Sequence, residues 1–274
     1  MGIVEDIKSL RIQGATNIAV YSLEYLKKFS DKHGFRKKFN SEMNKLLKVR
    51  STGVVLYNVV EILKKEKSKN KINQLLEQIK TSKEKVAENG EKLIKNNYQV
   101  YTHCHSSQAI AVIKEASKKK RFSVVVDVTE PKHQGIKTAK ELSKIKSIKV
   151  NLITDDAAGV ALSHQFLKES DIVIVGADAI RKEGVVNKIG TYLIALAAHE
   201  NKIPFYFATI TLKIDKRKKF HIELRNPSEV CKKIKNVNII NPAFDITPFK
   251  YVKGFITEKG ILSVNKIKKM LKNA

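Results

Sequence analysis

The sequence predicts an α/β protein, in which a helical N-terminal domain, residues 1–97, precedes a mainly parallel α/β domain, residues 98–274. Before residue 97, apolar residues recur at spacings of three, four and seven, which is the period of a helix. After that point, short apolar runs rich in Val and Ile alternate with helical segments. Such alternation is typical of a parallel sheet covered by helices.

The N-terminal elements follow from this spacing. Apolar residues at helical intervals run from Ile3 to Leu26, from Val54 to Leu63 and from Ile72 to Val86. Gly90 interrupts the last stretch shortly before the change of pattern. We expect helices throughout this domain and no strand.

The C-terminal elements alternate in type. We expect strands at residues 98–102, 122–128, 150–154, 172–175 and 205–211. We expect helices between them at residues 107–119, 138–144, 158–168 and 190–199. The tail adds a short strand or two, at residues 237–240 and 255–257, and a last helix at 264–271.

The chain is strongly basic, with a formal net charge of +26 at pH 7. Such a charge suits binding to the phosphates of a nucleic acid. The lysines are nevertheless spread along the whole chain, and there is no Trp and no basic motif interleaved with aromatic residues. We therefore interpret most of the charge as solvated surface, with weak and salt-sensitive attraction to RNA.

Composition also limits the cellular setting. With 42% apolar residues, the 274-residue chain can bury a sizeable core. No apolar run approaches the roughly 20 residues of a membrane-spanning helix, and the N-terminus lacks the basic start and apolar centre of a signal peptide. The two cysteines, Cys104 and Cys231, do not form a disulfide framework. We expect a cytoplasmic protein with no membrane partner.

The segment 171–191 is the most informative part of the chain. A buried-type strand is followed by Asp178, and then Asn187 and Lys188 precede an apolar helix. Ligands of open α/β sheets bind beyond the carboxyl ends of the strands. An acid, an amide, an ammonium group and a helix N-terminus gathered there suit an anionic, polyhydroxylated ligand. The alternative is an ordinary solvated loop between a strand and a helix.

Cys104 follows the first strand of the C-terminal domain, just before a helix whose first turn includes Ser106 and Ser107. The N-terminal end of a helix lowers a thiol pKa, and its free N–H groups and hydroxyls can receive a phosphate. The alternative is a buried structural cysteine, which the segment alone favours. No second cluster of Cys and His accompanies Cys104, so we expect no zinc site.

Polar residues also follow the second and third strands. Gln134 and Gly135 end a shaped loop after the second strand, and Asp155 and Asp156 follow the third. Either segment can also be an ordinary turn or helix cap. Because parallel strands end at one edge of a sheet, four successive polar clusters predict an active-site-like cleft at that edge.

One further candidate lies in the helical domain. Arg50 and two hydroxyl residues stand at the start of a helix, where an anion can bind. The same residues can equally form an ordinary helix cap.

A family resemblance rests on several short segments of the chain. They are Ile12-Gln-Gly-Ala, Arg50-Ser-Thr-Gly-Val, Thr102-His-Cys-His-Ser-Ser, Pro131-Lys-His-Gln-Gly, Gly176-Ala-Asp-Ala-Ile, Val186-Asn-Lys-Ile-Gly-Thr and Asn241-Pro-Ala-Phe-Asp-Ile-Thr-Pro. Over nearly its whole length the chain resembles the superfamily that unites the alpha, beta and delta regulatory subunits of translation initiation factor 2B with methylthioribose-1-phosphate isomerase and ribose-1,5-bisphosphate isomerase. The resemblance implies a helical N-terminal domain and a Rossmann-like C-terminal domain that mediates dimerisation, with a trimer of dimers in some members.

The resemblance implies an isomerase of the ribose-1,5-bisphosphate type. The isomerases use a cysteine after the first strand and an aspartate in the Gly-Ala-Asp segment, and Cys104 and Asp178 stand at these positions. We expect this pair to move a proton, or assist a hydride, between C2 and C1 of a ribose 1-phosphate-type substrate. A helix N-terminus would favour the Cys104 thiolate, and an apolar pocket would keep Asp178 protonated.

The expected substrate-binding residues are Arg50, Ser106, Ser107, Gln134, Asn187 and Lys188. No metal, nucleotide or other cofactor is expected. Where the isomerases commonly carry phosphate-binding arginines, this chain has Gln13 and Glu130, and Lys132, Arg50 or Lys188 can supply positive charge instead.

The alternative function is a noncatalytic regulatory protein of the initiation-factor-2B type. Such a protein would bind a nucleotide or sugar phosphate as an effector, together with a partner such as initiation factor 2. In either case we expect a homodimer or a higher homo-oligomer.

Overall fold

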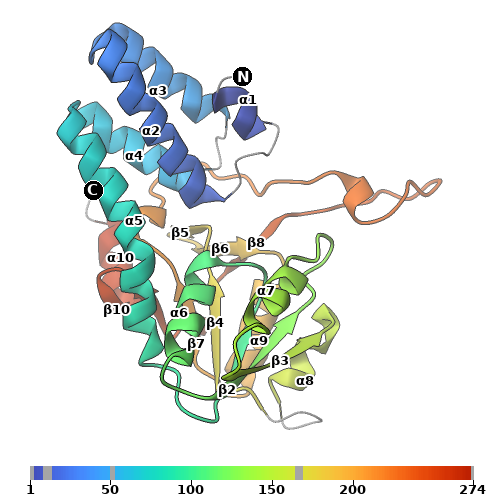
Figure 1. The fold of residues 1–274 in the computed structure, drawn as a ribbon. Helices are drawn as coiled ribbons and strands as arrows, with labels where there is room; N and C mark the ends of the chain where they lie inside the picture. The colour runs from blue at the N-terminus through green and yellow to red at the C-terminus, as the bar shows by residue number, and fades with distance from the viewer. Residues whose placement is uncertain (1–2, 9–13, 50–52, 164–168, 273–274) are drawn as a thin grey trace. The chain divides into compact units, whose positions relative to one another are not determined.

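A computed structural model of the protein describes residues 3–8, 14–49, 53–163 and 169–272 (Figure 1). The chain forms two compact units, one comprising Met1–Ser82 with Leu212–Asp215 and the other comprising Lys83–Thr211 with Lys216–Ala274. The division falls within a single helix, α5 (Lys69–Glu91). A folding boundary between residues 97 and 98 therefore stays a prediction.

The described part of the first unit is helical, as the apolar spacing predicts. It contains α1 (Ile3–Lys8), α2 (Ala15–His33), α3 (Lys37–Val49), α4 (Val54–Lys65) and the first part of α5. Its core includes fully buried Leu23 and Leu63. Residues 212–215 join these helices because the Asn58 amide donates hydrogen bonds to the carbonyl oxygens of Leu212, at 2.7 Å, and Ile214, at 2.8 Å.

A seven-stranded sheet forms the centre of the second unit, in the order β10-β9-β7-β4-β1-β2-β3. Its strands are β1 (Gln99–Thr102), β2 (Phe122–Asp127), β3 (Ile148–Ile153), β4 (Ile172–Gly176), β7 (Phe205–Ala208), β9 (Gly254–Thr257) and β10 (Gly260–Leu262). Neighbouring strands are parallel except for β9 and β10. This mainly parallel sheet confirms the predicted fold class.

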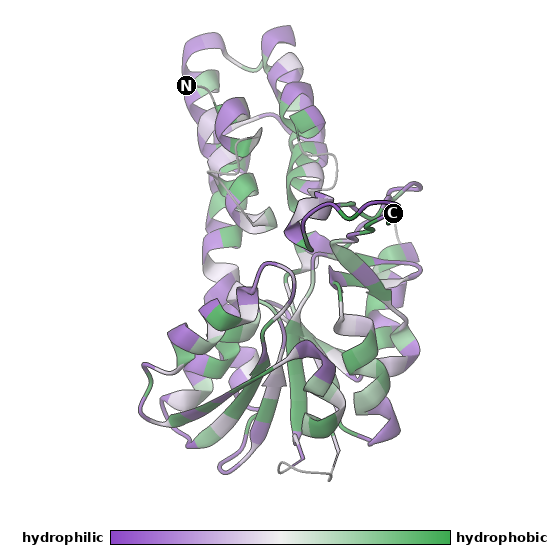
Figure 2. Ribbon diagram, turned by 90° about the vertical axis from the view of Figure 1, so that its right-hand side faces the viewer, coloured by the Kyte–Doolittle hydropathy of each residue, from purple (hydrophilic) through white to green (hydrophobic). Residues whose placement is uncertain are grey.

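Helices pack around the sheet of the second unit. They are the last part of α5, α6 (Ser107–Ser117), α7 (Gln134–Leu142), α8 (Ala158–Ala161), α9 (Thr191–Glu200) and α10 (Val264–Lys272). In Figure 2 the largely hydrophobic strands run between helices on either side. The central strands β1 and β4 are buried along their whole length. This burial explains why their sequences are continuous apolar runs.

A second, smaller sheet lies in the same unit. It is antiparallel and consists of β5 (Ala179–Arg181), β6 (Gly184–Lys188) and β8 (Phe244–Thr247), in the order β5-β6-β8. In its register Asn187 lies opposite Asp245, and Lys188 lies opposite Phe244. The interpretation of residues 184–188 as a solvated loop is therefore wrong, because Asn187 and Lys188 are buried members of a strand.

Two further expectations at the level of elements need correction. Residues 237–240 form no strand, although their apolar side chains suggested one. The helix expected at 158–168 ends already at Ala161 as α8, and residues 164–168 lie outside the described part of the chain. None of the described helices is long and apolar enough to cross a membrane.

Candidate functional site

The two predicted catalytic residues follow neighbouring strands. Cys104 comes just after β1, and Asp178 just after β4. The chain passes from β1 outward to β2 and β3, and then returns to β4 on the opposite side of β1. Ligands of open α/β sheets bind at such a switch point, outside the carboxyl ends of the strands. The fold thus delivers both residues to the edge where the sequence predicts a site.

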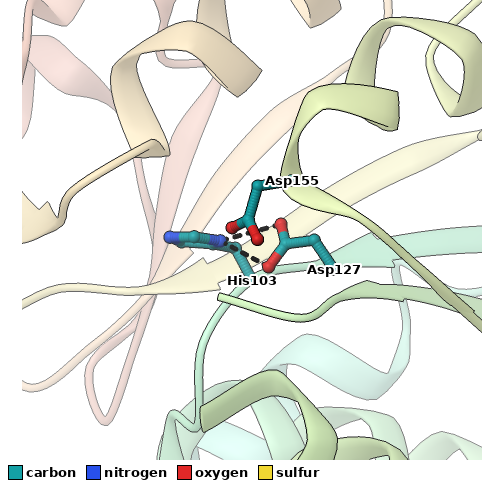
Figure 3. A group of neighbouring side chains, drawn as sticks. All are labelled: His103, Asp127 and Asp155. Carbon is teal, nitrogen blue, oxygen red and sulfur yellow. Dashed lines mark hydrogen bonds and ion pairs between the residues drawn. The ribbon is translucent and has the colours of Figure 1, made fainter. Parts of the chain in front are cut away.

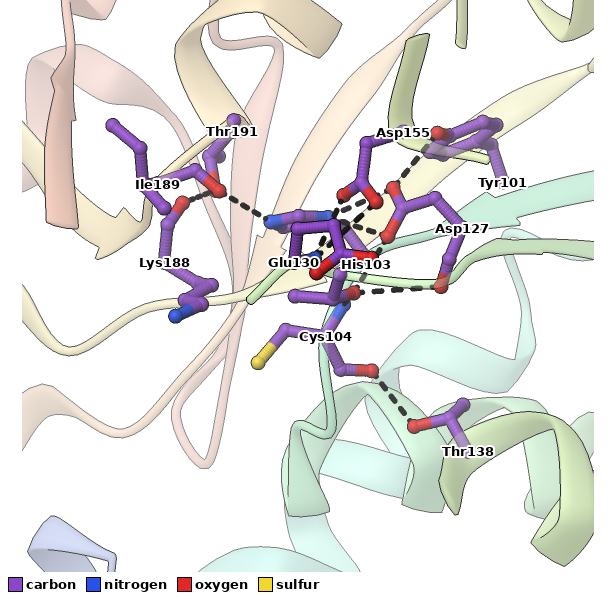
Figure 4. A network of polar contacts seen from close by, with 12 residues as sticks. Tyr101, His103, Cys104, Asp127, Glu130, Thr138, Asp155, Lys188, Ile189 and Thr191 are labelled. Atoms are coloured by element: carbon purple, nitrogen blue, oxygen red, sulfur yellow. Dashed lines mark hydrogen bonds and ion pairs between the residues drawn. The ribbon is translucent and has the colours of Figure 1, made fainter. Parts of the chain in front are cut away.

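The backbone of Cys104 is held in the left-handed region, with φ of 66°. Its N–H donates to Thr129 Oγ1 at 2.9 Å, and its carbonyl oxygen accepts from Thr138 Oγ1 at 2.7 Å. Figure 4 shows the sulfur directed away from the Asp127 side of this network. These two hydrogen bonds fix the main chain of Cys104, and neither of them uses the sulfur.

The thiol of Cys104 is protonated at neutral pH. Burial raises its pKa to about 12, and the lowering effect of a hydrogen bond from the His105 backbone is smaller. The expectation that the helix N-terminus favours a thiolate is therefore wrong. Desolvation of the charged sulfur outweighs the helix end.

Opposite charges act on this thiol from two directions. The carboxylate of Asp178 raises the pKa of Cys104, and the ammonium group of Lys188 lowers it. Lys188 itself is only 9% exposed, and burial lowers its pKa. The carboxylate of Asp178, and the sulfur of Cys104 when it is ionised, act in the opposite sense and raise the pKa of Lys188. Cys104, Asp178 and Lys188 therefore form one electrostatically coupled group.

Ser106 and Asn187 meet at the end of β4. A Cβ atom added to Gly176 would lie 2.4 Å from Ser106 Oγ and 3.8 Å from Asn187 Oδ1, so only glycine leaves room for the serine hydroxyl. Ser106 caps α6 by accepting a hydrogen bond from the Ala109 N–H at 3.3 Å. The Asn187 amide donates to Thr191 Oγ1 at 2.9 Å. The structure thus brings these two predicted binding residues together beside β4.

The other predicted binding residues are placed differently. Gln134 begins α7, and its buried Oε1 has no hydrogen-bond partner among the described residues. Ser107 donates to Gln108 Oε1 at 3.1 Å and lines, with His105, a groove of about 670 Å³ along α5 and α6. Arg50 lies outside the described residues, as does Gln13.

A basic pair bridged by a carboxylate was not predicted as a unit. Glu229 lies 3.0 Å from the Arg225 guanidinium and 3.3 Å from the Lys132 ammonium group. Arg225 and Glu229 both act on the pKa of Lys188, in opposite directions. Glu130, where the resemblance led us to expect an arginine, is exposed and pairs with His133 at 3.0 Å. Positive charge thus reaches the site from residues other than 130.

Asp245 is a second carboxylate that sequence reasoning did not single out. Its Oδ2 accepts hydrogen bonds from the N–H groups of Gly190, at 2.8 Å, and Tyr192, at 3.0 Å, and so caps α9. Its Oδ1 is buried with no hydrogen-bond partner among the described residues. Burial raises the pKa of Asp245 to about 6. The only sequence signal for it was its place in the segment 241–248.

His103, Asp127 and Asp155 gather closely enough to be considered as metal ligands (Figure 3). His103 Nδ1 lies 2.8 Å from both carboxylate oxygens of Asp127, and His103 Nε2 lies 3.0 Å from the carbonyl oxygen of Ile189. Both partners are acceptors, so the ring donates from both nitrogens and carries a positive charge. Burial acts to lower the pKa of His103, but hydrogen bonding and attraction by Asp127 outweigh it, and the pKa is raised. The arrangement suits a buried ion pair rather than a metal site.

Fold and site together define a class: a Rossmann-like α/β protein with a thiol, a carboxylate and a lysine at the switch point of its sheet. More specifically, the chain belongs to the Initiation factor 2 subunit family, which matches residues 11–264. This match confirms the family indicated by the sequence motifs.

Individual relatives are similar over nearly the whole chain. Ribose 1,5-bisphosphate isomerase of Archaeoglobus fulgidus is 38% identical, over 94% of this chain and 88% of that protein. A putative translation initiation factor eIF-2B subunit 2-like protein of Pyrococcus horikoshii is 35% identical, over 95% of both chains. The crystal structure of the translation initiation factor eIF-2B of Pyrococcus horikoshii OT3 matches with a TM-score of 0.81 and 33% identity, over 96% of both chains.

Proposed function

We propose that this protein is an aldose–ketose isomerase that converts ribose 1,5-bisphosphate into ribulose 1,5-bisphosphate. The observation that carries the proposal is the position of Cys104 and Asp178 after neighbouring strands at the switch point, with Lys188 coupled to both. Relatives named ribose 1,5-bisphosphate isomerase, at 35–38% identity over most of this chain, support the same substrate.

The reaction needs one group that gives a proton and another that takes one. The phosphate on O1 prevents the sugar ring from opening to an ordinary aldehyde, and in this proposal the ring opens as the C2 proton is lost. We assign removal of that proton to the Asp178 carboxylate. The Cys104 thiol protonates the ring oxygen O4, because burial keeps this thiol protonated. The C1–O4 bond breaks as the C1=C2 bond forms, which leaves an enol phosphate.

The second half of the reaction returns both protons. The Asp178 carboxylic acid gives its proton to C1, and the Cys104 thiolate takes the proton of the O2 hydroxyl. A carbonyl forms at C2, and both side chains regain their starting state. These roles reverse the assignment expected from the sequence, in which Cys104 was the thiolate and Asp178 the protonated acid.

A substrate with two phosphates also needs positive charge. Lys188, Arg225 and Lys132 supply it in this proposal, and a phosphate would compete with Glu229 for the last two. Asn187 and Ser106, which adjoin Gly176, would hold sugar hydroxyls. Ser107, Gln134 and Arg50 stay predicted binding residues.

Phosphorus NMR of the purified protein with separate sugar phosphates tests the substrate. We expect turnover of ribose 1,5-bisphosphate and much slower turnover, or none, of methylthioribose 1-phosphate. Turnover of neither sugar would overturn the proposal of an isomerase. Preference for the methylthioribose compound would overturn the assignment of the bisphosphate.

A second candidate function is a noncatalytic regulatory protein that binds a phosphorylated effector. The relative named as eIF-2B subunit 2-like favours it, since it aligns with this chain over 95% of both. Glu130 favours it as well, because it replaces an arginine expected in the isomerases. Copurification with initiation factor 2, together with no turnover of either sugar, would support this function over the isomerase.

We propose a homodimer or larger homo-oligomer that works in the cytoplasm. Segment 222–240 supports self-association because it exposes large apolar side chains, with Leu224 at 69% and Ile240 at 67% exposure. Such surface is rarely left uncovered in a monomer. Light scattering of the purified protein measures the assembly directly.

A further inference from the structure

The main chain of the site adopts an uncommon conformation at two places. Cys104 and Thr129 both have a left-handed backbone, with φ of 66° and 63°. Residues other than glycine seldom adopt this region, and a β-branched residue such as threonine does so at a cost. Contacts with the rest of the fold must therefore hold both residues in place.

One buried carboxylate supplies these contacts. Asp127, which is 1% exposed, accepts a hydrogen bond of 2.6 Å from Thr129 Oγ1. The same Thr129 oxygen accepts the N–H of Cys104 at 2.9 Å. Tyr101 also donates to Asp127, at 2.8 Å. A chain of two hydrogen bonds thus connects Asp127 to the backbone of the predicted catalytic cysteine (Figure 4).

The same carboxylate reaches the other side of the site. Asp127 holds the His103 ring at 2.8 Å, and His103 Nε2 donates to the carbonyl oxygen of Ile189 at 3.0 Å. Ile189 directly follows Lys188 at the end of β6. The strand that carries Lys188 and the loop that carries Cys104 are therefore tied to one ion pair.

We propose that Asp127, paired with His103, is a positioning residue. It holds the Cys104 thiol in place near Lys188 through hydrogen bonds that pass by way of the Thr129 hydroxyl. The proposal rests on the proposed function, in which this thiol protonates the substrate. Asp127 touches no substrate atom in this role. Loss of its connection to Cys104 slows the proton transfer and leaves the phosphate-binding residues in place.

The rival interpretation is a buried ion pair that only stabilises the fold. Both interpretations predict that Asp127→Asn lowers stability. They differ for Thr129→Val, which keeps the size and branching of the side chain but removes the hydroxyl between Asp127 and Cys104. Thr129→Ser restores the hydroxyl. Thr247→Val is the matched control, because the Thr247 hydroxyl is buried in β8 with no hydrogen-bond partner among the described residues.

The test compares these variants by steady-state kinetics and by alkylation of Cys104 with iodoacetamide, read by peptide mass spectrometry so that Cys231 is followed separately. For Thr129→Val we expect kcat to fall roughly 100-fold, the effect of a small misplacement of a reacting group, with KM near the wild-type value. Thr129→Ser should recover most of the lost kcat. Alkylation of Cys104 should rise roughly tenfold in Thr129→Val, as expected if loosening lowers the thiol pKa by about one unit.

The outcomes separate this proposal from the proposed function. Wild-type kcat and wild-type alkylation in a folded Thr129→Val protein would overturn the positioning role. So would an equal loss of kcat in Thr129→Ser or Thr247→Val. If the wild-type protein turns over no sugar phosphate but alkylation changes as expected, the isomerase proposal fails and the Thr129 hydroxyl, which links Asp127 to Cys104, still positions the thiol.

Discussion

At the scale of single residues, burial decides the chemistry of the site more than local sequence does. The thiol of Cys104 stands before a helix, which favours a thiolate, yet its pKa is raised to about 12 because the sulfur is desolvated. The position of Cys104 could be predicted from its place after a strand. Its protonation state could not, because desolvation depends on neighbours that are distant in the sequence.

The basic residues of the site lead to a prediction about affinity. Arg225→Ala should raise KM for ribose 1,5-bisphosphate by tenfold or more, since a hydrogen bond to a charged group contributes about 1.5–3 kcal/mol. The loss should be smaller for ribose 1-phosphate, which has one phosphate fewer. Steady-state kinetics with both sugars measures the difference.

Arg121→Ala is the control for Arg225→Ala, because Arg121 precedes β2 at the opposite edge of the sheet and is exposed. Equal KM values for wild type and Arg225→Ala would show that Arg225 does not bind a substrate phosphate.

Asp245 leads to a prediction about pH. Its pKa rises from 3.8 to about 6 on folding because the carboxyl is buried. The protonated form is favoured in the fold, so this group contributes stability below pH 3.8 that is lost as the pH rises through 6. The change amounts to roughly 3 kcal/mol. The side chain of asparagine cannot ionise, so the variant Asp245→Asn lacks this dependence.

Thermal unfolding of the wild type and of Asp245→Asn between pH 4 and pH 7 shows whether Asp245 lowers stability as the pH rises. The Tm of Asp245→Asn minus the Tm of the wild type should increase as the pH rises from 4 to 7. Parallel Tm curves would mean that burial does not shift the pKa of Asp245.

At the scale of elements, the parallel strands could be predicted and the small sheet could not. β1 and β4 are buried on both faces, so their sequences are continuous apolar runs. β5 and β6 are short and joined by a turn of two residues, Lys182 and Glu183, which precedes Gly184 with its φ of 147°. The polar residues of both strands are buried. Asn187 and Lys188 therefore resembled a loop, although they lie in a strand.

Local sequence patterns also failed to reveal several residues of the site. Arg225 and Glu229 belong to a long segment with little regular structure, where periodicity carries no information. Asp127 ends an apolar strand and pairs with His103, which lies 24 residues earlier. Nothing local distinguishes such a buried carboxylate from a helix cap.

The packing of α7 against β2 leads to a prediction about stability. A Cβ atom on Gly135 would lie 1.6 Å from the carbonyl oxygen of Asp127, so Gly135→Ala must displace the backbone. We expect a loss of more than about 3 kcal/mol in the free energy of unfolding, measured by denaturant titration.

Gly159→Ala is the matched control, because Gly159 lies in α8 with nothing within 4 Å of an added Cβ atom. It should change the free energy of unfolding by no more than about 1 kcal/mol, in the stabilising direction. Equal stability of the two variants would contradict the close approach of α7 to β2.

At the scale of the whole molecule, the order of the strands connects the fold to the function. The strand order changes side at β1, and this brings residues 74 positions apart, Cys104 and Asp178, to the ends of adjacent strands. The fold class and this convergence could be predicted from the alternation of strands and helices. The high net charge, +26, adds attraction for a bisphosphate and for other polyanions alike, so it does not identify the substrate.

Proton NMR of ribose 1,5-bisphosphate in D₂O, with the wild-type protein and the variants Cys104→Ser and Asp178→Asn, tests the central claim most directly. We predict that the wild-type protein forms ribulose 1,5-bisphosphate with deuterium at C1, because the transferred proton passes through an exchangeable side chain. Both variants should lose at least about 100-fold in rate. No product with the wild-type protein, or undiminished product with either variant, would contradict the claim.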